Sequence, residues 1–225
     1  LLWLLGQDLP GAVVVRSAEG EALPPEAAGD VDLEADRGEV LRFSLAGLQL
    51  KFSALMESDG GLTIPASGVG GSWIVKLPSA RHVSVPENEY VMMELAREVG
   101  IRVPDTKLIP MVDVAGLPSD TALSGLALAV RRFDRDGKGG RIHMEDFAQV
   151  FDVFPADKYA TASYENLAGV LWAEAAQSDV AEFARRLAFS ALIGNGDMHL
   201  KNWSLIYGDG RTAELAPAYD FVATV

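Results

Sequence analysis

The residues of this chain best suited to chemistry lie close together near the end of the sequence. Asp197 and Asn202 stand five residues apart in the run from Gly194 to Asn202, and Asp220 follows eighteen residues later. Transfer of a phosphoryl group from a nucleotide needs oxygen ligands for Mg²⁺ and a carboxylate that orients or deprotonates the attacking hydroxyl. Asp197 is suited to act as that base, and Asn202 and Asp220 are suited to bind Mg²⁺, so the spacing indicates a phosphotransfer site.

Two further side chains in this stretch have open roles. Lys201 could reach the transferring phosphate as a point charge. His199 is a candidate nucleotide-binding residue, although a histidine taken alone is more typical of packing or capping. Asx residues beside glycines also form ordinary turns. A metal-dependent hydrolase using Asp197, His199 and Asp220 is a weaker alternative, because three histidines and no cysteine leave few soft ligands.

Regular elements on both sides would position these residues. Apolar residues recur at helical spacing over 183–193, and glycines then end the pattern, so Asp197 is expected on a loop just past a helix. The strand patterns 205–207 and 212–215, with a glycine-containing turn between them, predict a short hairpin. This hairpin would bring Asp220 beside the loop that carries Asp197.

A second set of candidates would bind the phosphates of ATP. Lys76 lies inside the apolar strand pattern 72–78, where an unpaired ammonium would be costly, so it needs an anionic partner. Nucleotide phosphates would supply one, and Glu89, on the helix predicted over 86–99, is the candidate within the chain. The alternatives are an edge-strand lysine that reaches solvent and a first-turn glutamate that is favoured only by the helix dipole.

Earlier and later segments complete the predicted nucleotide site. Ser44, Ala46 and Gly47 are small residues where backbone N–H groups could approach phosphates, although an ordinary hairpin is the alternative. The nearly all-apolar strand pattern 126–133 is where a two-lobed kinase would have its hinge. Backbone groups near Arg131 and Phe133 would then grip adenine.

Strand patterns come first along the chain and helical patterns follow, which predicts an α+β fold in two lobes. We expect a β-rich small lobe of five strands and one helix, followed by a helical large lobe. The expected divisions are residues 1–36 for the end of an N-terminal subdomain and a linker, 37–135 for the small lobe, and 136–225 for the start of the large lobe. Helices are expected over 145–151, 164–176 and 178–193, with Ser178 and Asp179 capping the last.

Composition narrows the function classes. With 225 residues, 49% of them apolar, the chain is long enough to bury a core. The absence of cysteine excludes disulfides and thiolate chemistry, and a cytoplasmic setting fits. A net charge of -13 argues against direct nonspecific nucleic-acid binding, and no apolar run is long enough to span a membrane. Because the sequence does not begin with Met and stops soon after Asp220, we expect a fragment.

Several motifs together resemble those of the HipA family, the serine/threonine-kinase toxins of bacterial toxin-antitoxin modules, whose fold is protein-kinase-like. The matching segments are Ser44 to Lys51 (S-x-x-G-x-Q-x-K), Ile74 to Pro78 (I-x-K-x-P), Arg132 to Arg135 (R-F-D-R), Arg141 to Phe147 (R-x-H-x-E-D-F), and Gly196 to Asn202 with Tyr219 to Phe221. The resemblance covers most of the chain and is highly specific in combination.

The resemblance implies a role for each matched residue. Asp197 would be the catalytic base, Asn202 and Asp220 the Mg²⁺ ligands, and Lys76 the lysine that binds the ATP phosphates. Lys51 would belong to the phosphate loop. By the same resemblance Ser44 would be autophosphorylated, which shuts the kinase down by adding charge where ATP phosphates bind.

Partners also follow from the resemblance. A small helix-turn-helix antitoxin, similar to HipB, would supply all DNA binding, and the substrate would be a protein such as an aminoacyl-tRNA synthetase. Two alternatives remain open. A small-molecule kinase of the same fold would share the D-x4-N and Asp-Phe geometry, and a nonenzymatic nucleotide-binding partner of an antitoxin would bind ATP without turnover.

Overall fold

The computed structural model describes residues 8–15, 51–65, 70–78, 84–117, 124–154 and 163–224. The predictions for Ser44, Ala46 and Gly47, and for the linker before them, lie outside these residues. Within the described residues, no helix has the length and apolar character needed to cross a membrane.

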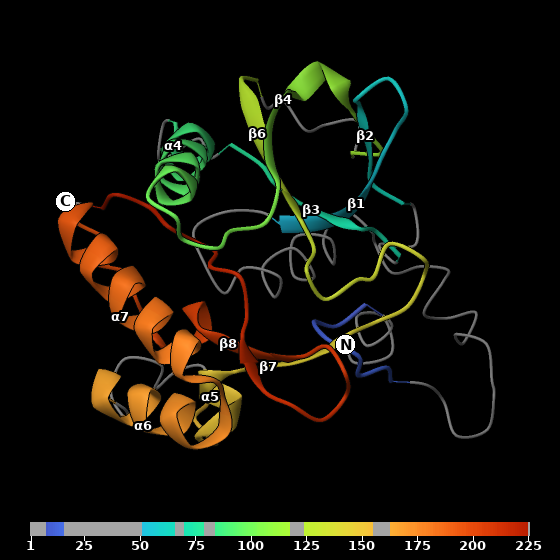
Figure 1. Cartoon of the computed structure of the whole chain (residues 1–225). Helices are drawn as coiled ribbons and strands as arrows, with labels where there is room; N and C mark the ends of the chain where they lie inside the picture. The colour runs from blue at the N-terminus through green and yellow to red at the C-terminus, as the bar shows by residue number, and fades with distance from the viewer. Residues whose placement is uncertain are drawn as a thin grey trace.

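The first part of the chain forms a six-stranded sheet with one helix against it (Figure 1). The strands are β1 (Lys51–Met56), β2 (Leu62–Thr63), β3 (Trp73–Lys76), β4 (Thr106–Pro110), β5 (Val114–Ala115) and β6 (Leu126–Arg131), in the order β4-β6-β3-β1-β2-β5. Helix α4 (Val85–Glu98) packs against β4 and β6. The sheet has one strand more than we expected, because the two-residue β5 pairs in parallel with β2.

The second part combines a small sheet with three helices. Strands β7 (His143–Asp146), β8 (Ser204–Tyr207) and β9 (Glu214–Leu215) form an antiparallel sheet in that order. The helices are α5 (Phe147–Val150), α6 (Tyr164–Glu174) and α7 (Gln177–Leu192), and the 3-10 turn η3 (Leu200–Asn202) precedes β8; a second 3-10 turn, η1 (Met111–Asp113), lies between β4 and β5 of the first part. The predicted hairpin before Asp220 is formed by β8 and β9.

Two details of the helical prediction are wrong. Residues 145 and 146 belong to β7, and Asp146 then caps α5 by accepting from the N–H of Gln149. Helix α7 begins at Gln177 with Ala176 as its N-cap and no side-chain cap, so Ser178 and Asp179 do not cap it. The Asp179 carboxylate instead lies 3.5 Å from Arg102, which means that a tertiary ion pair has replaced the local hydrogen bond.

A hydrophobic cluster of described residues joins the two parts. It contains Met93 and Ala96 of α4, Phe189 of α7, and Ala218 and Phe221 on either side of Asp220. The rings of Phe189 and Phe221 lie 5.0 Å apart between centroids. Burial of these apolar side chains is therefore what holds the segment around Asp220 between α4 and α7.

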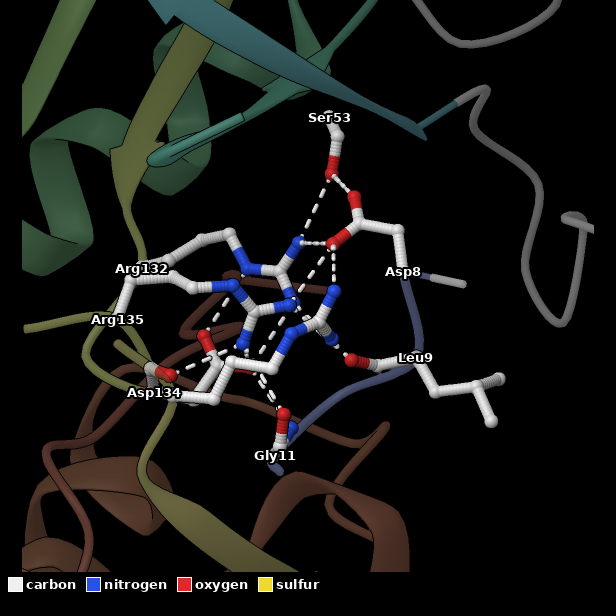
Figure 2. A network of polar contacts seen from close by, with 8 residues as sticks. Asp8, Leu9, Gly11, Ser53, Arg132, Asp134 and Arg135 are labelled. Carbon is white, nitrogen blue, oxygen red and sulfur yellow. Dashed lines mark hydrogen bonds and ion pairs between the residues drawn. The ribbon is translucent and has the colours of Figure 1, made fainter. Parts of the chain in front are cut away.

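A buried network of charges fastens the N-terminal segment to the chain after β6 (Figure 2). Asp8 Oδ1 lies 3.0 Å from Arg132 Nη1 and 2.8 Å from Arg135 Nη2, while its other oxygen accepts from Ser53 on β1. Asp134 pairs with the same two arginines at 2.9 and 2.8 Å. The R-F-D-R motif thus ties residues 8–11, the first sheet and the connection to β7 together.

Candidate active site

Lys76, the last residue of β3, lies at the centre of the charged cluster that joins the two parts of the chain. Its ammonium donates to Glu89 of α4 and to Asp220, and it is 4% exposed. Glu89 is 2% exposed, so the pair predicted from the burial of Lys76 is formed. Lys51, at the start of β1, places its Nζ 3.3 Å from Asp220 Oδ2. Two cations and two carboxylates therefore meet where β1, β3, α4 and the segment after β9 converge.

The charged groups of this cluster shift one another's pKa values. Burial lowers the pKa of Lys76, but Asp220 and Glu89 outweigh it, so the pKa lies above the ordinary value. Burial raises the pKa of Asp220, whereas Lys51 and Lys76 more than reverse the effect, so this pKa lies far below the usual range. Burial raises the pKa of Glu89 despite the neighbouring Lys76. At neutral pH Lys76 is a cation and Asp220 an anion.

The backbone at Asp220 has a conformation that residues other than glycine rarely adopt. Its φ is 58°, in the left-handed region, which is favourable for glycine and costs other residues about 1 kcal/mol. Neighbouring contacts hold it there: Phe221 is packed in the apolar cluster described above, and the hydroxyl of Tyr219 donates to the carbonyl oxygen of Lys201 at 2.9 Å. Strain of this kind is typical of functional positions.

The loop after α7 presents Asp197 as predicted, just past a helix. Asp197 is exposed, and its N–H donates to Asn195 Oδ1 at 3.1 Å. Asn202, in the turn η3, donates from Nδ2 to the carbonyl oxygen of Asp197 at 2.8 Å. The amide nitrogen of Asn202 thus closes the loop of the D-x4-N motif, and its Oδ1 can bind another partner.

Asn202 and Asp220 line the same small hollow, together with Asn195 and Trp203. A carboxamide oxygen and a carboxylate are ligands that suit Mg²⁺, which commonly takes only one or two ligands from protein and the rest from phosphates and water. Asn195 Nδ2 and Trp203 Nε1, on two residues that line the hollow, are buried without a hydrogen-bond partner among the described residues. The residues present fit a Mg²⁺–nucleotide complex.

The described residues do not form the grouping that a metal-dependent hydrolase would need. Within the described residues, no three side chains of histidine, aspartate or glutamate come together in a way that could hold a metal ion. Asp197 and His199 both lie in the loop before η3, whereas Asp220 faces Lys51 and Lys76.

The predicted adenine-binding positions lie at the end of β6. Arg131 is exposed and pairs with Asp105 at 3.2 Å, so its side chain is turned to solvent. The ring of Phe133 packs at a tilt against the ring of Tyr219, with centroids 5.7 Å apart. Phe133 is therefore in contact with the residue that precedes Asp220, and the backbone after β6 runs beside the charged cluster.

Sequence reasoning missed two side chains that brace the site. Asn88, beside Glu89 on α4, hydrogen-bonds with the main chain of Ala223, and Thr224 hydrogen-bonds with Gly194 and Gly196 in the loop before Asp197. The sequence signal available was only proximity: Asn88 is adjacent to Glu89, and Thr224 lies four residues after Asp220.

Two solved structures share this mixed fold of sheets and helices. HipA of Shewanella oneidensis, solved in a complex with HipB and its operator DNA, matches with a TM-score of 0.69 and 22% identity over 97% of this chain and 56% of its own. The Helicobacter pylori proinflammatory kinase CtkA matches with a TM-score of 0.50 and 15% identity over 76% of this chain and 51% of its own. At these identities the likeness shows the fold.

The sequence defines the family. Residues 43–225 match the HipA-like C-terminal domain, so the chain belongs to that family, and the predicted resemblance is confirmed. A Sinorhizobium fredii protein named "Putative kinase Y4dM" is 57% identical over 228 residues, which cover 100% of this chain and 55% of the relative. Y4mE of the same organism is 36% identical over 96% of this chain and 49% of its own length. The chain spans about half the length of these relatives.

Proposed function

We propose that the chain is part of an ATP- and Mg²⁺-dependent serine/threonine protein kinase of the HipA type. The observation that carries the proposal is the buried ammonium of Lys76, held between Glu89 and Asp220. The proposal includes a two-lobed, protein-kinase-like fold: residues 37–135 form the small lobe, 136–225 begin the helical large lobe, and 1–36 end an N-terminal subdomain and linker. Membership of the HipA-like family and the names of the relatives support it.

Each residue has a role in this reaction. Bound Mg²⁺–ATP supplies the phosphoryl group and neutralises its charge. Lys76 and Lys51 attract the phosphates by charge, and Asn202 and Asp220 provide the protein's oxygen ligands for the metal. Asp197 accepts the proton of the attacking hydroxyl, whose oxygen forms a bond to the γ-phosphorus while the bond from that phosphorus to ADP breaks. The remaining proposed contacts to the nucleotide and phosphate come from Ser44, Ala46, Gly47, Glu89, Arg131, Phe133, His199 and Lys201.

Regulation and partners belong to the same proposal. We infer that Ser44 is autophosphorylated and that the antitoxin is a helix-turn-helix protein that carries the DNA contacts. The solved HipA relative binds HipB and operator DNA in one complex, which supports the inference. The net charge of -13 favours DNA binding through a partner rather than by this chain. The substrate class is a protein, such as an aminoacyl-tRNA synthetase.

The test is a phosphotransfer assay on the full-length protein with γ-labelled ATP and Mg²⁺. Wild type should become labelled on Ser44, and Asp197→Asn should lower the rate by about 10²- to 10⁴-fold because it removes the general base. Ser44→Ala should lose the label while still phosphorylating an added protein substrate. Asp209→Asn, in the exposed turn between β8 and β9, makes the same chemical change outside the site and should behave as wild type.

Three results would contradict the proposal. Label that appears on small molecules and never on protein would identify a small-molecule kinase. ATP binding without any transfer of label would favour a nonenzymatic partner of an antitoxin. Equal labelling of wild type and Asp197→Asn would remove Asp197 from the chemistry.

A further inference from the structure

The side chain of Asn88 holds the segment that follows Asp220 against helix α4. Asn88 Nδ2 donates to the carbonyl oxygen of Ala223 at 2.9 Å, and the N–H of Ala223 donates to Asn88 Oδ1 at 3.0 Å. Both polar groups of the carboxamide thus pair with both main-chain groups of one residue. Aspartate has no donor and alanine has neither group, so neither residue can make this pair of bonds.

The position of Asn88 links two parts of the charged cluster. It is adjacent to Glu89, which pairs with Lys76, and Ala223 lies three residues after Asp220. The first turns of α4 therefore contact both Lys76 and the segment that carries Asp220. Because the φ of Asp220 is 58°, the local sequence does not favour this conformation, and tertiary contacts are needed to hold it.

Thr224 continues the contact to the loop that carries Asp197. Its N–H donates to the carbonyl oxygen of Gly194 at 3.1 Å, and its hydroxyl donates to the same oxygen at 3.0 Å. The hydroxyl also accepts from the N–H of Gly196 at 2.7 Å. Residues 220–224 are thus fixed to α4 on one side and to the loop before Asp197 on the other.

We propose that Asn88 and Thr224 are positioning residues for phosphotransfer. Asn88 sets Asp220 relative to the pair of Lys76 and Glu89, and Thr224 sets the Asp197 loop relative to Asp220. The inference rests on the proposed kinase function. The two side chains should affect different quantities: Asn88 the binding of metal with nucleotide, and Thr224 the rate of turnover.

The test uses full-length protein carrying Asn88→Asp, Asn88→Ala or Thr224→Val, with Glu98→Gln as a control at the exposed end of the same helix. Phosphotransfer is measured against Mg²⁺ concentration, and the binding of Mn²⁺–ATP is measured by calorimetry, which requires no turnover. Asn88→Asp should raise the Mg²⁺ needed for half-maximal rate, and weaken Mn²⁺–ATP binding, by about tenfold, as expected for one or two lost hydrogen bonds.

The variant Thr224→Val should lower kcat by about tenfold without changing the Mg²⁺ requirement, because its bonds reach the loop of the base. Glu98→Gln should leave both quantities unchanged. Hydrogen exchange provides a further readout: the amide of Ala223 should exchange faster in both Asn88 variants. If Asn88→Asp does not fold, Asn88→Ala gives the same comparison.

The two proposals fail in different ways. If wild type transfers phosphate and both Asn88 variants keep its Mg²⁺ requirement and Mn²⁺–ATP affinity, the positioning role is overturned and the kinase proposal stands. The same holds if these variants lose only stability. If wild type transfers no phosphate but the Asn88 variants weaken Mn²⁺–ATP binding, the kinase proposal fails and the positioning of Asp220 is supported.

Discussion

Replacing Asp8 by asparagine should remove one charge from the buried network that fastens the N-terminal segment. The Asp8 side chain is 7% exposed, and Arg132 and Arg135 approach it at 3.0 and 2.8 Å. In wild type Asp8 and Asp134 both pair with these two guanidinium groups, and Arg141 Nη2 lies 3.9 Å from Asp8 Oδ1. Asparagine has nearly the same shape, so the change tests charge and hydrogen bonding with little loss of packing.

The magnitude follows from the bonds that change. A hydrogen bond to a charged group contributes about 1.5–3 kcal/mol, and two such bonds to Asp8 are weakened. Asp134 continues to accept from both arginines, at 2.9 and 2.8 Å, and an asparagine carbonyl in the place of Oδ1 still accepts from both as a neutral acceptor. We therefore expect a loss of about 3 kcal/mol in the free energy of unfolding, at the lower end for breaking a buried ion pair.

The assay is urea unfolding of the full-length protein followed by tryptophan fluorescence. Trp73 and Trp203, 8% and 3% exposed, report on the two parts of the chain. The control is Asp105→Asn, which breaks the pair with Arg131 at 3.2 Å between side chains that are 65% and 55% exposed. That exposed pair should contribute less than about 0.5 kcal/mol. The midpoint should fall for Asp8→Asn with an unchanged denaturant slope.

A cost for Asp8→Asn that is no larger than for Asp105→Asn would refute the reasoning. It would mean that Asp134 alone compensates both guanidinium groups, or that water replaces the lost charge. The R-F-D-R motif would then have no structural role in fastening residues 8–11.

Three further changes test the packing and the buried charges. Gly71→Ala should destabilise the fold by about 3 kcal/mol, since the new Cβ would lie 2.3 Å from a backbone nitrogen of β1. Gly169→Ala, at a position with open space in α6, should stabilise the fold by about 0.5–1 kcal/mol. Thermal unfolding measures both changes. Arg186→Met should lower the free energy of unfolding by about 3 kcal/mol, because Arg186 is 2% exposed and pairs with a buried glutamate. Arg185→Met, at a neighbouring arginine that is 50% exposed, should lower it by less than about 0.5 kcal/mol. Equal losses would contradict this. Burial raises the pKa of Tyr207 to about 12, so this residue stays protonated at pH 10. Tyr207→Phe should therefore leave the tyrosinate absorbance at pH 10 unchanged. A loss equal to the absorbance of half a tyrosinate would contradict the shift.

Much of the site could be predicted because it follows local rules. An ammonium inside an apolar strand requires an anion, which led from Lys76 to Glu89 on the following helix. Helical periodicity ending at glycines placed Asp197 on a loop, and the β8 and β9 hairpin brought Asp220 back toward it. Five of the six strands of the first sheet and the order of strands before helices also follow from such patterns, whereas the two-residue β5 did not.

The failures come from contacts between distant segments. Asn88 and Ala223 are 135 residues apart, and no spacing rule connects them. Asp179 was expected to cap α7, but its carboxylate pairs with Arg102, 77 residues away. The Asp8 network likewise needs the folded chain, because its arginine partners lie more than 100 residues further along. In each case a polar side chain pairs with a residue distant in the sequence rather than with a neighbouring one.

The ion pairs around Lys76 have a consequence for how metal and nucleotide bind together. Lys51 and Lys76 both pair with Asp220, and Lys76 also donates to Glu89. A divalent cation that arrived alone would gain little from such a cluster and would have to draw Asp220 away from two ammonium groups. A triphosphate that arrives with the cation gives those ammonium groups new partners. We therefore expect metal and nucleotide to raise each other's affinity by the same factor, as linkage requires.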